Sequence, residues 1–472
     1  MRPVIIGTQV VLIAFFVLSN VFQTVLVGSA FAQMLRHRRT VWIERTHRLL
    51  DSPLTPRVSV LAPAHDEAAT VAESVRSLLT LSYPDLEVVV VNDGSTDDTL
   101  DVLRAEFDLQ PVTPSWPQVV TTKPVRGLYR SPRHRGLVVV DKENGGKADA
   151  LNAGINVATG ELVCSIAADT LLEPAALLRV VRPLLADDGT VAAGGSIRVV
   201  NGSVVRAGRV VEMRLARRLL PGIQTVEYLR AYLVGRLGWN RLGGNLIVSG
   251  AFGMFRRNAL VAIGGYTHGS VGEDMELVVR LRRRGLESRR ASRVIFVPDP
   301  IAWTEVPESV RVLARQRDRW QRGLADVVRR HRDVTFRRRY GTLGWIGMPY
   351  FITIELFGPV LEVLGLLGLG VGLLTGAVDV SVAVAIGLLG YGWGVLLSSG
   401  AVLLHQWASI DAFRARDLAR LLLYAVAENV GYRQLNLVWR LRGLWRFARG
   451  RTEWGEMTRV GFEQPRSSSS AG

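Results

Sequence analysis

An uncharged segment near the N-terminus most constrains how this chain can fold. Residues 4–32 contain no charged side chain, and the basic run RHRR follows at 36–39. At about 1.5 Å per residue, a helix of this length crosses a hydrocarbon core of about 30 Å with some tilt. A cleaved signal peptide is the alternative, but its positive charges would precede a shorter apolar region. The sequence therefore predicts a transmembrane helix over residues 1–35, with the N-terminus outside and the chain after it in the cytoplasm.

Three further apolar segments lie late in the chain. The segments at about 344–375 and 380–407 are long enough to cross a bilayer, although the first carries Pro349, Pro359 and two glutamates and also fits an interfacial position. The third, 418–438, is flanked by arginines on both sides. A full crossing would place one arginine group outside, so we expect a partly embedded or interfacial helix there.

The charge balance supports a membrane protein with a basic cytoplasmic face. The net charge is +16 although 48% of the residues are hydrophobic. Nucleic-acid binding is the competing interpretation of the charge, but the chain has no recognition motif for it, so we predict no nucleic-acid partner. A single cysteine, Cys164, excludes an intrachain disulfide and fits a reducing compartment.

Residues 55–335 alternate β-branched runs with helical patterns, which predicts a parallel α/β sheet. Strands are expected at 57–63, 86–93, 136–141 and 161–169, and helices at 67–81, after Ser95, and at 147–158. Residues 108–135 are rich in proline and basic residues and are expected to form a surface excursion. Residues 226–244 fit an amphipathic helix on the membrane surface or an ordinary core helix.

Acidic residues follow three of the predicted strands. Asp66 and Glu67 come after the first, Asp93 ends the second, and Asp169 ends the fourth. Ligands of open α/β sheets bind at the carboxyl ends of the strands. A single acid there is often only a helix cap, but three such strand ends within one short stretch predict a binding site.

Several short motifs together resemble a known enzyme family. APAHDE, VVNDGSTD, GGKADALNAG and the AAD loop are followed by SGAFGMFRR, GEDMELVVRLRRRG and RQRDRWQRG. This series resembles family 2 glycosyltransferases with the GT-A fold. The Gln-x-x-Arg-Trp element is similar to that of membrane-embedded processive members, among them cellulose, hyaluronan, chitin and poly-N-acetylglucosamine synthases. The resemblance covers residues 57–325 and implies an α/β GT-A (Rossmann-like) cytoplasmic catalytic domain flanked by transmembrane helices.

The resemblance implies a set of residues that bind the nucleotide sugar. Asp93 would contact the uridine, and Ala64, Asp66 and Glu67 of APAHDE would lie beside it, although this chain has His-Asp where tyrosine and asparagine are more usual. Lys147 of GGKADALN would lie near the phosphates or the uracil. A solvated lysine in the first turn of a helix is the ordinary alternative for Lys147.

A divalent metal is the implied cofactor. Asp169 matches the second acid of an Asp-x-Asp motif and is expected to hold Mg²⁺ or Mn²⁺, while Ala167 stands where the first acid would be. Such an ion takes most of its remaining ligands from phosphate oxygens and water, so one protein carboxylate can suffice. We expect Ala167 to weaken donor binding more than it impairs catalysis.

The motif GED carries the expected catalytic base. Asp274 matches the family's general base, and Gly272 replaces a commoner threonine. Transfer from a nucleotide diphosphate needs one carboxylate base, because the leaving group departs unprotonated, and it inverts the anomeric carbon. Glu273 is expected to contact the acceptor and to raise the pKa of Asp274 by like-charge repulsion. The same acids also suit the positive end of a helix, and both roles are compatible.

Gln316, Arg319 and Trp320 lie at i, i+3 and i+4, and therefore share one helix face. The resemblance implies that this face binds the acceptor or polymer, with the indole stacked on a sugar ring. A packed helix face is the ordinary alternative. The preceding segment WTEVPES, residues 303–309, resembles the loop of poly-N-acetylglucosamine-type synthases and favours N-acetylglucosamine as the donor sugar.

The sequence thus predicts a hexosyltransferase that moves a sugar from a UDP-sugar, with UDP-N-acetylglucosamine favoured, to a growing β-linked polysaccharide. It would be processive, inverting and coupled to export, in a multi-pass cell membrane protein with membrane lipids and an accessory subunit as further partners. A non-processive transferase with a lipid acceptor and a catalytically inactive membrane scaffold are the alternatives. The expected organisation is an N-terminal transmembrane helix (1–35), a basic cytoplasmic linker (36–54), the GT-A domain with interfacial helices (55–335), two transmembrane or interfacial segments (336–410), an amphipathic or third membrane segment (411–455) and a disordered tail (456–472).

Overall fold

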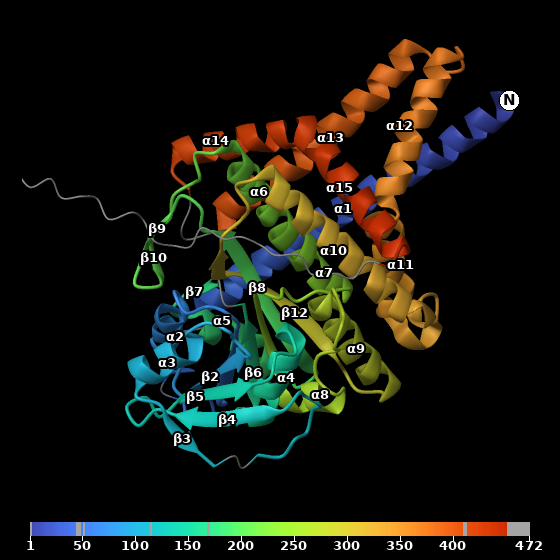
Figure 1. The fold of residues 1–472 in the computed structure, drawn as a ribbon. Coiled ribbons are helices and arrows are strands. Elements are labelled where there is room, and N and C mark those ends of the chain that lie inside the picture. The colour runs from blue at the N-terminus through green and yellow to red at the C-terminus, as the bar shows by residue number, and fades with distance from the viewer. Residues whose placement is uncertain are drawn as a thin grey trace, which may run out of the picture.

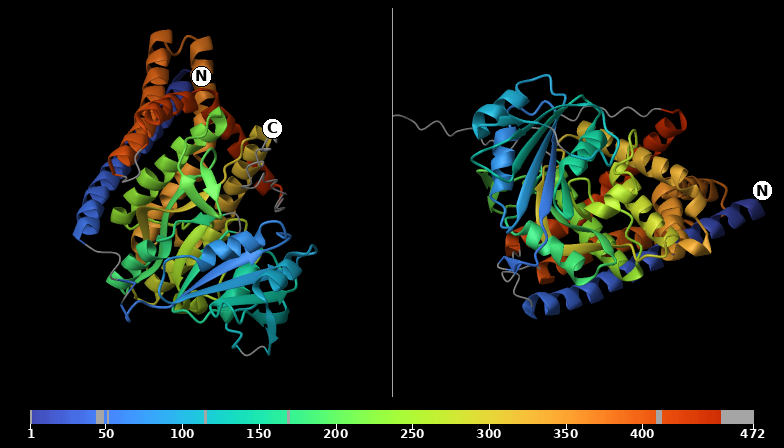
Figure 2. Two further views of the ribbon diagram at one scale, coloured as in Figure 1. Left: turned by 90° about the vertical axis from the view of Figure 1, so that its left-hand side faces the viewer. Right: turned by 90° about the horizontal axis from the view of Figure 1, so that it is seen from below.

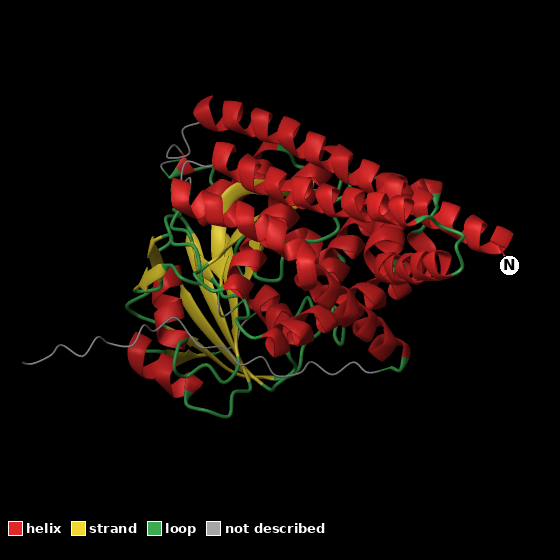
Figure 3. Ribbon diagram, turned by 90° about the horizontal axis from the view of Figure 1, so that it is seen from above, coloured by secondary structure: helices red, strands yellow, loops and turns green. Residues whose placement is uncertain are grey.

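A computed structural model describes residues 2–43, 49–50, 52–113, 116–167, 170–408 and 413–450. A ten-stranded mixed sheet forms one side of the molecule, and long helices gather along the other (Figures 1 and 3). The strand order is β3-β4-β5-β2-β1-β6-β11-β8-β12-β7. The predicted tail lies outside the described residues, as do Ala168 and Asp169.

Four neighbouring strands of the sheet are parallel to one another and confirm the four predicted strands. They are β1 (Val58–Ala64), β2 (Leu86–Asp93), β5 (Leu137–Lys142) and β6 (Leu162–Ile166), joined through α2 (Val71–Leu79), α3 (Thr99–Phe107) and α4 (Lys147–Val157). Their valines are buried because helices cover both faces, which is why the strands are almost wholly apolar. Strand order reverses at β1, between β2 and β6, and such a switch point opens a crevice at the carboxyl ends.

The second half of the sheet is mixed. β11 (Phe252–Arg256) runs antiparallel to both β6 and β8 (Thr190–Val199), whereas β12 (Arg293–Thr304) is parallel to β8. The short β7 (Leu171–Leu172) closes this edge against β12. The accompanying helices are α5 (Ala176–Ala186), α8 (Arg257–Ala262) and α9 (Glu273–Glu287), and a separate hairpin is formed by β9 (Val204–Arg206) and β10 (Arg209–Glu212).

The expectation that residues 108–135 are only a surface excursion is wrong. They contain β3 (Gln110–Val112) and β4 (Val125–Arg130), and β4 pairs antiparallel with β5. Tyr129 of β4 is buried, and the Arg104 guanidinium lies 4.6 Å from its ring centre. Edge strands tolerate charged residues, so the basic composition that suggested a loop suits this position equally well.

The segment 226–244 takes the second of its two interpretations, that of a packed core segment. It spans the end of α6 (Leu219–Leu229), the π-helical turn η2 (Arg230–Arg236) and α7 (Leu237–Leu242), with Tyr232, Leu237 and Trp239 buried. α7 packs on α1 (Arg2–Ile43), where the Ser29 hydroxyl donates to the Gly238 carbonyl over 2.8 Å. This contact ties the N-terminal helix to the segment that follows α6, and α1 runs along the outside of the molecule (Figure 2).

Two described helices are long and apolar enough to cross a membrane, Leu12–Arg39 within α1 and Val380–Ala408, which is α13. A third candidate is the pair Leu343–Leu356 and Gly358–Leu374 (α12), which is bent by 46°. α12 and α13 form a hairpin that projects away from the sheet (Figure 1). The segment predicted as one helix at 418–438 consists of α14 (Ala415–Ala427) and α15 (Arg433–Ala448), separated by a kink at Gly431 with φ of 80°.

α10 (Val310–Arg330) lies between the sheet and the hairpin of α12 and α13 (Figure 1). Five short helical segments follow it: η3 (Arg332–Val334), η4 (Arg338–Tyr340), η5 (Leu343–Gly347), α11 (Met348–Tyr350) and η6 (Phe351–Leu356). α10 carries the predicted Gln-x-x-Arg-Trp element. It contacts α9 beside the sheet and η6, which belongs to the bent candidate membrane pair.

Candidate active site

A cavity of about 1450 Å³ opens at the carboxyl ends of the parallel strands. It extends from the switch point at β1 to the helices that follow α10. Most of the predicted site residues line it: Ala64, Glu67, Asp93, Lys147, Glu273, Asp274, Gln316, Arg319 and Trp320. Asp66 does not line it, and Asp169 lies outside the described residues. Residues that are far apart in sequence thus share one chamber.

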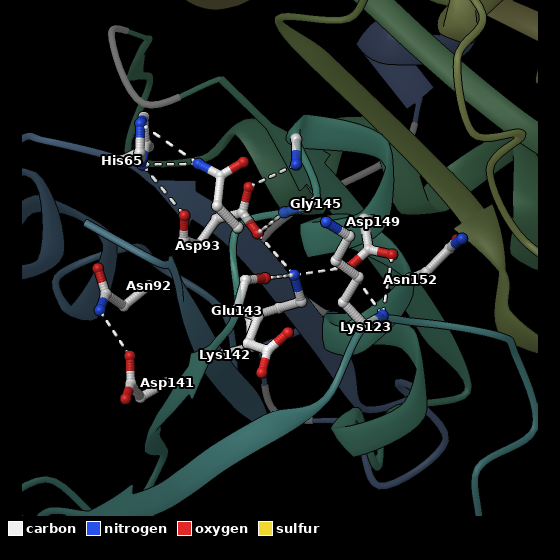
Figure 4. Close-up of polar contacts among 12 residues, drawn as sticks. His65, Asn92, Asp93, Lys123, Asp141, Lys142, Glu143, Gly145, Asp149 and Asn152 are labelled. Atoms are coloured by element: carbon white, nitrogen blue, oxygen red, sulfur yellow. Dashed lines mark hydrogen bonds and ion pairs between the residues drawn. The ribbon is translucent and has the colours of Figure 1, made fainter. Parts of the chain in front are cut away.

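Asp93 is held in a frame of donors at the end of β2 (Figure 4). Its Oδ1 accepts from Lys142 Nζ at 2.6 Å and from the Gly145 amide at 3.0 Å, while its Oδ2 accepts from the Gly146 amide at 2.7 Å. A Cβ at position 145 would lie 2.5 Å from Asp149 Cγ, so only glycine fits this turn. The frame fixes one orientation of the carboxylate beside the cavity.

Sequence reasoning missed Lys142, which is 0% exposed. Its ammonium lies 2.6 Å from both Asp93 Oδ1 and Asp149 Oδ1 (Figure 4). Asp149 also accepts the Lys123 amide at 3.1 Å and lies 3.4 Å from His268 Nδ1. A buried charge needs such partners. The available signal was a lysine at the end of a strand that begins with four apolar residues.

Asp66 turns away from the cavity. It adopts a positive φ of 54°, and its Oδ1 accepts the Thr96 amide at 2.7 Å. This hydrogen bond is the main cause that lowers the pKa of Asp66. His65 lines the cavity instead, with Nδ1 3.0 Å from the Asp93 carbonyl and 3.2 Å from Asn144 Nδ2. In this structure Asp66 therefore orders the loop after β2, and a direct contact with the nucleotide remains a prediction.

Asp274 lies at the start of α9 and faces Lys147 across Gly250. Asp274 Oδ2 accepts the Gly250 amide at 3.1 Å, and Lys147 Nζ donates to the Gly250 carbonyl at 2.9 Å. Lys147 also approaches Glu273 Oε1 at 3.5 Å. α9 begins at Glu273, so the helix-start role of these acids holds alongside any catalytic one.

Burial raises the pKa of Glu273, and the charge of Asp274 raises it further, while Lys147 opposes both. That repulsion from Glu273 raises the pKa of Asp274 stays a prediction, whereas the pKa of Glu273 itself is raised. Glu273 is the more buried carboxylate, which explains why repulsion within this pair favours protonation there.

The predicted face of α10 points into the same chamber. Gln316 is buried, and its Oε1 accepts no hydrogen bond from any residue that the structure describes. Trp320 is 46% exposed, and the Arg317 guanidinium lies 4.3 Å from its ring centre. An exposed indole backed by a cation, beside an amide oxygen without a donor, suits the stacking and hydrogen bonding of a sugar ring.

The predicted site for Mg²⁺ or Mn²⁺ lies at the turn after β6. The Ala167 amide donates to the Ala251 carbonyl at 3.2 Å, and Ala167 accepts the Thr170 amide at 3.1 Å. Among the described residues no three histidine, cysteine, aspartate or glutamate side chains gather to hold an ion. Asp169, the acid expected to hold the ion, lies outside the described residues, so its role stays a prediction.

A mixed sheet in which the antiparallel β11 pairs with β6, together with an acid-lined cavity at the carboxyl ends of the parallel strands, is typical of the GT-A class of enzymes. The sequence matches the family described as "Glycosyl transferase family 2" over residues 59–264 and "Glycosyl transferase family group 2" over residues 162–397, half of the chain. The chain belongs to the family 2 glycosyltransferases, as the sequence predicted, and its GT-A fold with flanking apolar helices is confirmed.

Curated relatives agree with this family. A "Probable glycosyltransferase YdaM" of Bacillus subtilis is 29% identical over 304 residues, which is 64% of this chain and 63% of the relative. A "Poly-beta-1,6-N-acetyl-D-glucosamine synthase" of Staphylococcus epidermidis is 26% identical over 311 residues, 65% of this chain and 63% of the relative. The match thus spans under two thirds of the length of these relatives.

Solved structures show weaker likeness. A mannosyltransferase from Pyrobaculum calidifontis in complex with GDP-Man and Mn²⁺ is 22% identical, covers 86% of this chain and 99% of that one, and has a TM-score of 0.49. A glucosyl-3-phosphoglycerate synthase from Mycobacterium tuberculosis with Mn²⁺ and UDP is 18% identical, covers 61% and 84%, and has a TM-score of 0.35.

Proposed function

We propose that this chain transfers a sugar, with inversion, from a UDP-sugar to the end of a growing β-linked polysaccharide. UDP-N-acetylglucosamine is the favoured donor. The observation that carries the proposal is that Asp93, Asp274 and Trp320 line one cavity. In this proposal Asp93 contacts the nucleotide, Asp274 acts as the base and the Trp320 indole stacks on a sugar ring. Sequence similarity to poly-β-1,6-N-acetyl-D-glucosamine synthases supports the choice of donor and product.

In this proposal, different residues of the chain bind the donor and accept the proton. Asp93, fixed by Lys142 and the Gly145 and Gly146 amides, holds the uridine, and Lys147 faces the diphosphate. The acceptor hydroxyl attacks the anomeric carbon, the bond from that carbon to UDP breaks, and Asp274 takes the hydroxyl proton. The electron pair leaves with UDP, and because attack and departure occur on opposite faces the anomeric configuration inverts.

A divalent cation would be held by Asp169, with Mg²⁺ or Mn²⁺ as candidates. When bound, it neutralises charge on the departing diphosphate. Ala167, which has no side-chain ligand to offer, leaves this role to a single acid of the loop, and we infer that phosphate oxygens and water complete the coordination.

Processivity and export are supported by the helices that line the cavity beyond α10. Beyond Trp320 it is lined by Tyr350 and Glu355 of the bent helix pair and by Asn436 and Arg440 of α15. A polymer that leaves the acceptor site in this direction meets candidate membrane helices at once. We infer a multi-pass protein of the cell membrane with its catalytic domain in the cytoplasm, in contact with membrane lipids and open to an accessory subunit.

The proposal is tested by UDP release and product analysis with full-length, detergent-purified protein. A panel of UDP-sugars is offered with Mg²⁺ or Mn²⁺ and then with chelator, and labelled products are sized and extracted with organic solvent. We expect chelator-sensitive polymer from one donor, abolished in Asp274→Asn and unchanged in Asp101→Asn, an exposed acid of α3. Single additions recovered in the organic phase would instead establish the non-processive transfer to lipid, and unimpaired turnover of Asp274→Asn would refute the base.

A further inference from the structure

The bent helix pair that borders the cavity has a definite chemical cause for its break. Pro359 stands in the first turn of α12 and has no backbone N–H. In a continuous α-helix, residue 359 would donate to the Glu355 carbonyl, and a proline ring also clashes with that carbonyl. The two helices therefore meet at an angle of 46°, and the Glu355 carbonyl cannot accept a hydrogen bond from residue 359.

Two side chains from other helices donate hydrogen bonds to this carbonyl instead. Gln321 Nε2 of α10 lies 3.3 Å from the Glu355 carbonyl oxygen and donates to the Leu356 carbonyl at 3.1 Å. Arg440 of α15 donates through Nη2 to the Glu355 carbonyl and lies 3.2 Å from Glu355 Oε2. Gln321 and Arg440 are also joined to each other, because Arg440 Nε donates to Gln321 Oε1 at 2.9 Å.

The shared contacts form one closed set, which we call the bend clamp: Gln321, Arg440 and the Glu355 and Leu356 carbonyls. Gln321 is buried, so each of its polar atoms needs a partner. A close approach of α15 to α10 makes the clamp possible, since a Cβ at Gly443 would lie 2.8 Å from the Asp318 carbonyl oxygen and 3.0 Å from Gln321 Cβ.

The clamp lies directly behind the sugar-stacking face of α10. Gln321 follows Trp320 in the chain, and both line the cavity together with Tyr350 and Glu355 of the helical segment that ends at the bend. The Tyr350 hydroxyl donates to Glu355 Oε1 at 3.2 Å, and the Tyr350 ring packs on Trp239 with centres 5.1 Å apart. The position of this aromatic and carboxylate wall relative to Trp320 thus depends on how the clamp holds the end of that segment at the bend against α10.

We propose that Gln321 and Arg440 are positioning residues that hold the Pro359 bend against α10, and so set the acceptor side of the active site. This inference rests on the proposed function, because it assigns the far wall of the cavity to the acceptor saccharide. The donor side is built from β-strand ends and α9, which the clamp does not touch. Loosening the clamp therefore impairs sugar transfer to the polymer and spares donor hydrolysis by water.

The test partitions labelled sugar between polymer and free sugar for the full-length protein in detergent. In Gln321→Leu we expect polymer to fall about tenfold, while free sugar from donor hydrolysis and the donor KM of that reaction stay within about twofold. Arg440→Lys, which loses the planar fork, should show the same split. Gln110→Leu, which changes an exposed edge-strand glutamine, is the matched control and should alter neither product.

A rescue variant separates this role from ordinary packing. Pro359→Ala restores an N–H that can reach the Glu355 carbonyl, so Gln321→Leu should cost less thermal stability in the Pro359→Ala background than alone. This cycle needs no product and tests the clamp even if the unaltered protein makes no polymer, a result that would refute the proposed function instead. Additive losses of thermal stability in the cycle, or a parallel loss of polymer and hydrolysis in both Gln321→Leu and Arg440→Lys, would overturn the inference.

Discussion

Gly272 and Gly323 meet backbone to backbone. A Cβ built on Gly272 would lie 3.1 Å from the carbonyl carbon of Gly323, and one built on Gly323 would lie 3.1 Å from the Gly272 Cα. Gly272 directly precedes the acids of α9, and Gly323 follows Trp320 by one turn of α10. The contact therefore sets how closely the candidate base approaches α10, the helix proposed to bind the acceptor. It also gives a physical reason for glycine at position 272, because a larger side chain would press on Gly323.

Gly272→Thr should push α9 away from α10. We expect a loss of about 1–3 kcal/mol in stability from overpacking and a fall in turnover that exceeds the change in donor KM, because Asp274 moves relative to the acceptor. Thermal unfolding and initial rates measure the two effects. Gly387→Ala in α13 is the matched control, since a Cβ there meets nothing within 4 Å. A Gly272→Thr protein with unchanged stability and rate would show that the helices have room to adjust.

Lys142→Met should disrupt the donor side. It leaves the Asp93 and Asp149 carboxylates facing each other without the buried ammonium between them, a change that costs about 3–5 kcal/mol when one partner of a buried ion pair is removed. UDP binding, followed by calorimetry, should weaken as well, because Asp93 loses one of the donors that orient it. Lys123→Met keeps the buried ion pair, since Lys123 contacts Asp149 through its backbone amide. It should therefore behave like the unaltered protein; an equal loss in both variants would contradict the network.

Much of the donor half of the site was predictable, because its elements are local. Runs such as VVVV in β2 can be buried only in a covered sheet, and the acids that follow β1 and β2 mark the carboxyl edge. What sequence reasoning missed depends on tertiary contacts. Whether Asp66 or His65 faces the cavity is decided by the positive φ of Asp66, and the partner of Lys142 on α4 is set by how that helix packs.

The acceptor half was predicted from one face of α10 only. The spacing of Gln316, Arg319 and Trp320 identifies the face that lines the cavity. It carries no sign that Gln321, on the adjoining face, caps a broken helix, because the need for that cap arises from Pro359, which is distant in sequence. Likewise the basic composition of residues 108–135 could not distinguish a loop from an edge strand, since the pairing of β4 with β5 is non-local.

Ala167→Asp tests the proposed metal site by addition instead of removal. A second carboxylate at the end of β6 should raise the affinity for Mg²⁺ or Mn²⁺, since affinity for such ions grows with ligand charge. We expect the metal concentration for half-maximal UDP release to fall about tenfold, with donor KM lowered and product unchanged. Ala68→Asp, in the exposed loop after β1, is the control. A lower maximal rate with no change in metal dependence would show that position 167 is not part of the metal site.

Glu273 predicts a pH dependence of stability with a definite sign. Its folded-state pKa is raised above the ordinary value of 4.5, so the folded protein holds this proton more tightly than the unfolded chain does. Its contribution to stability is therefore present in acid and is lost as the pH rises above about 4.5 and through the higher folded pKa. Glu273→Gln cannot ionise, so its melting temperature relative to the unaltered protein should increase across that window. Glu106→Gln should shift in the opposite sense, because the Arg76 guanidinium lowers the pKa of Glu106 and ionisation there favours the folded state. Melting curves of the three proteins from about pH 2 to about pH 8 cover both windows, since the change at Glu106 falls below its ordinary pKa of 4.5. Parallel curves for Glu273→Gln and the unaltered protein would mean that Lys147 compensates the buried charge in full.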